Sequence, residues 1–350
     1  MSVSEQDVLG VLSTIQDPDL HRDIVSLGFV QKPEILDGTV SVRIILTTPA
    51  CPVRDQMQTE AQEKLLALPG VREANVTMEA NVAQHRIAQG HPVEGVRHLI
   101  AVASNKGGVG KSTVAVNLAV ALGRLGARVG LMDADVTGPN IPTMMGIGAG
   151  AQAEGPGGLR VEERHGIRVC SIGFVLPKGT PVVWRGPMIG TAVRQLLHDI
   201  DWGELDYLLI DLPPGTSDAS MSMAQEAPIS GVVIVSTPQD VALEDAAKAV
   251  SMFDKLNVPV FGLIENMSYF LCPHCGERTE IFGHGGAREA AEELGLEFLG
   301  ELPLDPATRA GGDSGEPIVA AAPESAQAQA FVAVAKQVAA RCSVLEYAGV

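Results

Sequence analysis

The sequence has few aromatic residues, few basic residues and no long apolar run. Aromatic side chains make up 4% of its 350 residues, whereas hydrophobic residues as a whole make up 46%. A core built mainly from Ala, Val, Leu and Gly is typical of an α/β protein with a buried parallel sheet. The length is sufficient for two domains with sizeable cores.

The deficit of positive charge excludes one large class of partners. Lys and Arg total 25 against 42 Asp and Glu, which gives a formal net charge of -17. Because binding to a phosphate backbone needs clustered Lys and Arg, we expect no nucleic-acid partner. No apolar run approaches the roughly 20 residues of a membrane span, and the acidic start, Met1 to Asp7, lacks the layout of a secretion signal. These absences predict a cytoplasmic protein without a membrane partner.

Cysteines are also scarce, with five in the whole chain. An odd number in a long chain does not indicate a disulfide framework, so we expect free thiols. Cys272 and Cys275 stand two residues apart in Cys-Pro-His-Cys-Gly, a spacing that lets two thiolates hold one metal centre. Three interpretations stay open. They are a structural zinc site to which His274 or His284 contributes, a dithiol oxidoreductase, and an iron–sulfur cluster that takes four thiolates and is shared by two chains.

The most informative stretch is a phosphate-binding loop at residues 105–113. It follows an apolar strand pattern at 99–103 and precedes a helical pattern at 114–125. Strand, glycine-rich turn and helix in this order direct backbone N–H groups at an anion. We expect Lys111 to reach the β- and γ-phosphates and Ser112 to hold Mg²⁺. The predicted nucleotide-binding residues of the loop are Asn105, which stands where glycine is usual, Lys106, Gly107, Gly108, Val109, Gly110, Lys111, Ser112 and Thr113.

Carboxylates follow two further strand patterns. The apolar run 207–210 ends in Asp211, as in the second half of a phosphate-loop site, where the carboxylate orders the water ligands of Mg²⁺. Asp135 follows another strand and is expected to position the attacking water. Asp133 competes for that role, and either residue could simply cap the following loop. Strands and helices alternate from residue 99 onward, which predicts a doubly wound, mostly parallel sheet.

Residues 1–82 predict a separate small α+β domain. Helix, β-hairpin, helix and strand patterns follow one another there. Residues 83–98 contain Gly, Pro and three histidines without periodicity and predict a linker, which leaves residues 99–350 as the nucleotide-binding domain. Cys51 precedes the second helix of the small domain. It is either a reactive thiol, its pKa lowered by the helix dipole, or a small core residue.

With these motifs assembled, the chain resembles the Mrp family of iron–sulfur cluster carrier ATPases, relatives of the MinD and ParA partition ATPases. The likeness spans nearly the whole chain. Residues 106–113 resemble the deviant phosphate loop of that superfamily, and residues 133–140 and 210–216 resemble its two switch segments. Residues 265–268, followed by the cysteine pair, resemble the segment that separates cluster carriers from partition ATPases. Residues 47–52 resemble the cluster-assembly domain often fused in front.

The resemblance implies an ATP hydrolase that uses ATP, Mg²⁺ and a [4Fe-4S] cluster. It implies a homodimer in which Lys106 reaches the partner's nucleotide, with Asn266 near the adenine. It further implies that Cys272 and Cys275 of both copies hold one cluster, which is then transferred to apoproteins. The expected catalytic residues are Lys106, Lys111, Asp135 and Asp211. The main alternative is a MinD- or ParA-like partition or positioning ATPase with a structural zinc at the cysteine pair, and a thiol oxidoreductase is more distant.

Overall fold

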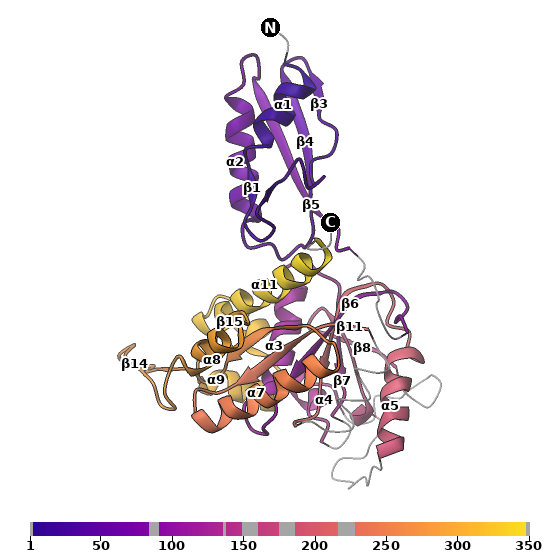
Figure 1. Cartoon of the computed structure of the whole chain (residues 1–350), viewed down its shortest axis with the longest axis vertical. Coiled ribbons are helices and arrows are strands. Elements are labelled where there is room, and N and C mark those ends of the chain that lie inside the picture. Colours follow the sequence, from indigo (N-terminus) through magenta and orange to yellow (C-terminus); the bar gives the residue numbers. More distant parts are fainter. Residues whose placement is uncertain are drawn as a thin grey trace. The chain divides into compact units, whose positions relative to one another are not determined.

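The structure, a computed structural model, divides the chain into two compact units (Figure 1). It describes residues 3–83, 91–135, 138–148, 160–174, 186–215 and 228–347, without the side chains of 186–189 and 240–242. The small unit is Met1–Ala83 together with Ala339–Val350, and the large unit is Gln84–Val338. The last residues of the chain thus group with the small unit, whereas the sequence assigns them to 99–350.

The small unit contains the predicted helix, hairpin, helix and strand, together with two short strands after the first helix that the sequence did not predict. Its elements are α1 (Glu5–Leu12), β1 (Gln16–Asp17), β2 (Arg22–Asp23), β3 (Glu34–Leu36), β4 (Thr39–Leu46), α2 (Arg54–Leu66) and β5 (Glu73–Ala80). Ser4 and Asp7 form a capping box that fixes the start of α1. Strands β3 and β4 form the expected antiparallel hairpin, and β5 returns parallel to β4 after the crossover helix α2.

The core of the small unit includes the end of the last helix, α11 (Ala326–Tyr347). The Tyr347 ring meets the Phe29 ring edge-on at 5.9 Å between centroids, and Thr47 Oγ1 donates to Ser343 Oγ at 2.9 Å. Cys51 packs in the same core with 8% of its surface exposed, three residues before α2 begins. This burial favours the interpretation of Cys51 as a core residue.

The large unit is built on a sheet that has eight strands within the described residues. Their order is β15-β12-β11-β6-β10-β7-β9-β8, and all neighbours are parallel except β8 and β9. The strands are β6 (Val96–Ala103), β7 (Val129–Asp133), β8 (Glu162–Arg164), β9 (Ile167–Ser171), β10 (Leu205–Asp211), β11 (Ile229–Ser236), β12 (Val260–Glu265) and β15 (Phe298–Glu301). The predicted mostly parallel sheet is confirmed. Strand β6 begins at Val96, inside the range expected to be a linker.

Helices cover this sheet, which explains the burial of its strands (Figure 1). They are α3 (Lys111–Arg124), α4 (Ile141–Met144), α5 (Gly186–His198), α7 (Asp240–Lys255), α8 (Gly286–Leu294), α9 (Pro306–Ser314), α10 (Ile318–Ala321) and α11. Every residue of β10 and β11 is buried, as expected when both faces of a parallel sheet are covered. Among the described residues, no helix has the length and apolarity to cross a membrane.

The topology brings several polar strand ends to one edge of the sheet. The chain passes from β6 to β7, which lies beyond β10, whereas β11 pairs with the other side of β6. Ligands bind at such switch points, outside the carboxyl ends of the strands. Asp211 ends β10 and stands in register with Asp133 at the end of β7. Glu265 ends β12 on the other side of β6. The phosphate loop therefore begins beside β10, which ends in Asp211, and two strands away from β12, which ends in Glu265.

Candidate nucleotide site and cysteine hairpin

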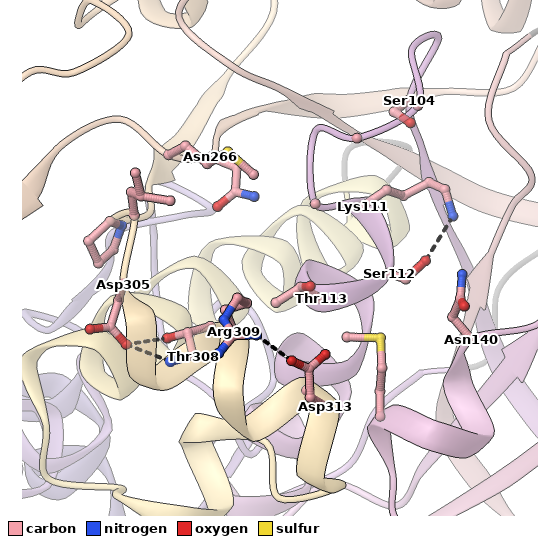
Figure 2. Close-up of a pocket in the computed structure, with 18 of the residues that line it drawn as sticks. Ser104, Lys111, Ser112, Thr113, Asn140, Asn266, Asp305, Thr308, Arg309 and Asp313 are labelled. Carbon is pink, nitrogen blue, oxygen red and sulfur yellow. Dashed lines mark hydrogen bonds and ion pairs between the residues drawn. The ribbon is translucent and has the colours of Figure 1, made fainter.

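A cavity of about 940 Å³ opens beside the phosphate loop (Figure 2). Its volume lies in the range of roughly 300–1,000 Å³ that is usual for small-molecule sites. Most residues of the loop line it, and segments that precede and form α9 line another part. Its apolar lining comprises Met144, Met267, Phe270, Ile281, Pro303 and Leu304. The cavity thus offers hydrogen-bonding groups to phosphates and an apolar surface to a flat base.

The phosphate loop takes a conformation that requires glycine. Gly108 and Gly110 both have φ of +82°, which is unfavourable for residues with a Cβ. At Gly110 a Cβ atom would also lie 2.3 Å from Nδ2 of Asn266. That amide donates to the carbonyl oxygen of Val109 at 2.8 Å. Asn266, itself buried, therefore holds the loop and lines the cavity. Its expected position near the adenine stays a prediction.

Lys111 and Ser112 line one end of the cavity, and the buried Asp211 lies behind them, in contact with Lys111. Lys111 forms a salt bridge with Asp211, and their side chains are only 7% and 1% exposed. The Lys111 ammonium also donates to Ser112 Oγ at 3.4 Å, as Figure 2 shows. Burial raises the pKa of Asp211, and the neighbouring Lys111 opposes this shift. The start of α3, with its unpaired N–H groups and positive dipole end, faces the same space.

The two aspartates that follow β7 have different surroundings. Asp133 is fully buried, and its Oδ2 accepts from Ser171 Oγ at 2.9 Å and from the backbone N–H of Ile141 at 3.3 Å. Burial, and then the charge of Asp211, raise the pKa of Asp133 to about 8. Asp135 is half-buried and lines the cavity. Asp133 therefore holds the loop in place, and Asp135 is the one available to a ligand.

Two loop residues lie near α7. Asn105, which stands where glycine is usual, donates from Nδ2 to Asp245 Oδ1 of this helix at 3.4 Å. Lys106 is exposed, lines the cavity and lies within the electrostatic reach of Asp245. The stronger partner of Asp245 is Lys248, whose Nζ lies 2.9 Å from its Oδ1 and lowers the pKa of that carboxyl. Lys106 is thus left at the rim of the cavity.

Helix α9 contributes cavity residues that sequence reasoning missed. Asp305 caps this helix by accepting from the backbone N–H of Thr308 at 2.6 Å and from its hydroxyl at 2.8 Å. One turn later, Arg309 and Asp313 form an ion pair along the cavity lining (Figure 2). No known motif covers this segment, although Asp followed by Pro is a helix-start signal that predicts α9 itself.

Cys272 and Cys275 lie at the tip of a short hairpin, the cysteine hairpin, which comprises residues 269–281. Strands β13 (Phe270–Leu271) and β14 (Arg278–Thr279) pair antiparallel, and Gly276, at φ +74°, closes the turn by donating to the carbonyl oxygen of Cys272 at 2.8 Å. Backbone N–H groups of His274 and Cys275 lower the pKa of the Cys272 thiol. This turn favours thiolates as metal ligands, and no helix begins at the pair, as a dithiol oxidoreductase would need.

The other three cysteines do not join this pair. Cys51, Cys170 and Cys342 are all buried, whereas Cys272 is half-buried and Cys275 is exposed. Burial raises the pKa of the Cys170 thiol to about 12. Each chain therefore offers two accessible thiols, both on the cysteine hairpin.

Comparisons with known families and proteins agree with this geometry. Residues 95–339 match the family described as NUBPL iron-transfer P-loop NTPase, and residues 5–78 match the family described as iron-sulfur cluster assembly protein. The iron-sulfur cluster carrier protein of Deinococcus radiodurans is 49% identical over 96% of this chain and 95% of its own. The protein of the same name from Escherichia coli K12 is 38% identical over 97% of this chain and 92% of its own.

Solved structures resemble the large unit. A nucleotide-binding protein from Archaeoglobus fulgidus, in complex with ADP, is 42% identical, covers 64% of this chain and 88% of its own, and has a TM-score of 0.55. The cell division ATPase MinD of Pyrococcus furiosus shares the fold at 24% identity and a TM-score of 0.54, over 69% of this chain and 98% of its own. Taken with the phosphate loop and the cysteine hairpin, these matches show that the chain belongs to the family of NUBPL iron-transfer P-loop NTPases.

Proposed function

We propose that this protein is an ATP-hydrolysing iron–sulfur cluster carrier, which holds a [4Fe-4S] cluster between two copies of the chain and transfers it to apoproteins. The observation that carries the proposal is the pair of a half-buried and an exposed cysteine on a hairpin, two other residues of which line the nucleotide cavity. The family to which the chain belongs, and the names of its relatives, support iron transfer as the activity. The cluster is cargo in this scheme, and ATP is the substrate.

The polar end of the cavity suits a nucleoside triphosphate with Mg²⁺. We assign the phosphates to Lys111 and the N–H groups at the start of α3. Ser112 would hold Mg²⁺, which neutralises phosphate charge, and Asp211 would order the water ligands of the ion. Asp135 is assigned to the attacking water because it reaches the cavity, unlike Asp133. Asn266 is assigned to the base end of the ligand.

Ligand counting supports a cluster shared by two chains. A [4Fe-4S] cluster takes four thiolates, and only Cys272 and Cys275 of each chain are accessible. Two copies related by a two-fold axis bring the same patch together and supply four. Large apolar side chains also lie exposed at the base of the cysteine hairpin, with Ile281 at 51% and Phe282 at 37%, as expected of a surface that is covered in an assembly.

Protein purified without oxygen tests the proposal directly. We expect iron and acid-labile sulfide in equal amounts, with the broad visible absorption of a [4Fe-4S] cluster, and transfer of both to an apoprotein that lacks its cluster. Free thiols and a cluster cargo also fit the expected cytoplasmic location. Stoichiometric zinc without sulfide would instead support the partition-type ATPase with a structural zinc.

Lys106→Ala should separate nucleotide binding from hydrolysis. If Lys106 reaches across to the partner's phosphates, its loss should leave ATP affinity nearly unchanged and lower kcat by roughly 10³–10⁵, as for a trans-acting arginine finger. Isothermal titration and phosphate release measure the two effects. Lys248→Ala is the matched control, since it removes the same charge from the surroundings of Asp245 without touching the cavity. Equal losses of binding and turnover in Lys106→Ala would assign Lys106 to its own subunit's nucleotide.

A further inference from the structure

A network of polar side chains lies at the base of the cysteine hairpin. Arg278 of β14 donates to Glu301 Oε1, at the end of β15, at 3.3 Å. Its NH2 group lies 3.0 Å from Nδ1 of His284, and its guanidinium stacks on the Tyr269 ring at 4.0 Å from the centroid. Ser268 Oγ lies 2.9 Å from the same His284 nitrogen. Contacts with residues outside the two strands of the hairpin thus hold the Arg278 side chain in place.

The network continues to the segment that holds the phosphate loop. Glu265, at the end of β12, is fully buried and accepts from Ser268 Oγ at 2.6 Å and from the N–H groups of Gly285 and Ala287 at 3.0 and 2.8 Å. The next residue is Asn266, which donates to the carbonyl oxygen of Val109 in the phosphate loop. A continuous series of hydrogen bonds and one peptide bond therefore joins the loop to Arg278.

Glu265, His284 and Glu301 come close enough to be considered as metal ligands, since their ligand atoms lie within 4.8 Å of one another. Both oxygens of Glu265 already accept hydrogen bonds from donors of the protein. The Arg278 guanidinium occupies the open side of the group, in contact with the other two residues. A cation there would face a fixed positive charge. The arrangement is that of an anchoring network and not of a metal site.

The hairpin also forms part of the nucleotide cavity. Phe270 on β13 and Ile281, which follows β14, both line it. A backbone hydrogen bond also joins the hairpin to the cavity wall. The N–H of Leu304, another lining residue, donates to the carbonyl oxygen of Tyr269 at 2.7 Å. Side chains on both arms of the hairpin that carries Cys272 and Cys275 therefore form part of the cavity wall.

We propose that Arg278 is a positioning residue that couples the nucleotide cavity to the cysteine pair. By anchoring the hairpin to Glu301 and His284, it keeps Phe270 and Ile281 in the cavity wall. A bound nucleotide that packs against these two side chains favours the same arrangement of the hairpin in which both thiolates face one metal. Because the two ligands favour one arrangement, each raises the affinity of the other. The inference rests on the proposed function only in taking a nucleotide as the occupant of the cavity.

Cobalt(II) is a suitable probe, because its thiolate-to-metal absorption reports binding at the cysteines without any cluster. The full-length reduced protein is titrated with Co²⁺ in the presence and absence of saturating MgADP, with Cys272→Ala as the blank. We expect MgADP to tighten Co²⁺ binding by roughly fivefold or more, and Co²⁺ to tighten ADP binding by the same factor. Arg278→Gln should bind each ligand alone and lose the mutual effect.

Two further variants sharpen the test. Arg288→Gln removes an arginine that stacks on Phe298 and takes no part in the network, so it should keep the full effect. Ile281→Ala truncates a half-exposed side chain and should weaken the coupling even if Arg278→Gln does not fold. Equal or weaker Co²⁺ affinity with MgADP in the unmodified protein would overturn the inference. Full coupling in a folded Arg278→Gln variant would also overturn it, as would full coupling in Ile281→Ala if Arg278→Gln does not fold. If protein purified without oxygen held no iron and no sulfide, and its Co²⁺ titration still showed the coupling, only the carrier function would be contradicted.

Discussion

Lys111→Ala should lose ATP binding and hydrolysis together. The Lys111 ammonium is the only Lys or Arg charge that the described structure buries at the polar end of the cavity. Loss of a single charge-assisted hydrogen bond of about 1.5–3 kcal/mol would weaken binding by roughly 10- to 150-fold, and a lysine that contacts two phosphates would cost more. Turnover should fall below detection. Titration calorimetry with an unhydrolysed ATP analogue and a phosphate-release assay measure the two effects.

The buried partner of Lys111 makes a second variant necessary. Lys111→Ala removes the ion-pair partner of Asp211, which is 1% exposed, and removing one member of a buried pair costs about 3–5 kcal/mol of folding free energy. Adding Asp211→Asn removes the unpaired charge, so the double variant should regain much of the melting temperature and none of the nucleotide binding. If stability and binding returned together, Lys111 would act through the fold and not on the phosphates.

Cys272→Ala and Cys275→Ala should each remove nearly all of the bound cluster. The bridging arrangement predicts about four irons for every two chains, and either substitution leaves two thiolates where a [4Fe-4S] cluster takes four. Iron and sulfide should therefore fall close to zero in both variants, and the iron-dependent dimer should dissociate. ATP binding should persist, because the phosphate loop follows a different strand. Elemental analysis and mass in solution measure these outcomes.

His274→Ala is the matched control for both cysteine variants. Its side chain is exposed between the two cysteines, and the backbone N–H that it directs at Cys272 is retained by Ala. The cluster should remain in this variant, whereas a zinc held by the two thiolates and this imidazole would be lost or weakened. About four irons on a strictly monomeric protein would contradict the bridging arrangement.

Local signals predicted the conformation around residues 105–113 well, and the roles of the residues there stay predictions. Residues 105–113 contain the glycines that their turn needs and lie between a strand pattern and a helix pattern. The sequence alone was therefore sufficient to place Lys111 and Ser112 at the start of the helix. Asp211 could be placed for the same reason, because an apolar strand in a parallel sheet leads to the same edge as the loop. The mostly parallel sheet followed from the alternation of elements. These features depend on residues close together in sequence.

Features that depend on distant residues could not be predicted. Asp133 is buried and accepts a hydrogen bond from Ser171, which reaches it only because β9 pairs with β7. Arg309 and Asp313 enter the cavity through the packing of α9. The segment expected as a linker at 83–98 ends earlier than predicted for a similar reason, since Val96 already pairs with β10. No local sequence pattern predicts any of these contacts.

The end of α11 has a consequence for how the protein is made. Phe29 and Thr47 find partners in Tyr347 and Ser343, so the hydrophobic core near the start of the chain is closed by residues near its end. Ala339 emerges from the ribosome more than 250 residues after Ala83. At roughly 5–20 residues per second, the nascent small unit waits about 10–50 s before its last packing partners exist. Of the two units, the small one begins to be synthesised first, but its core is completed only after the whole large unit has been synthesised.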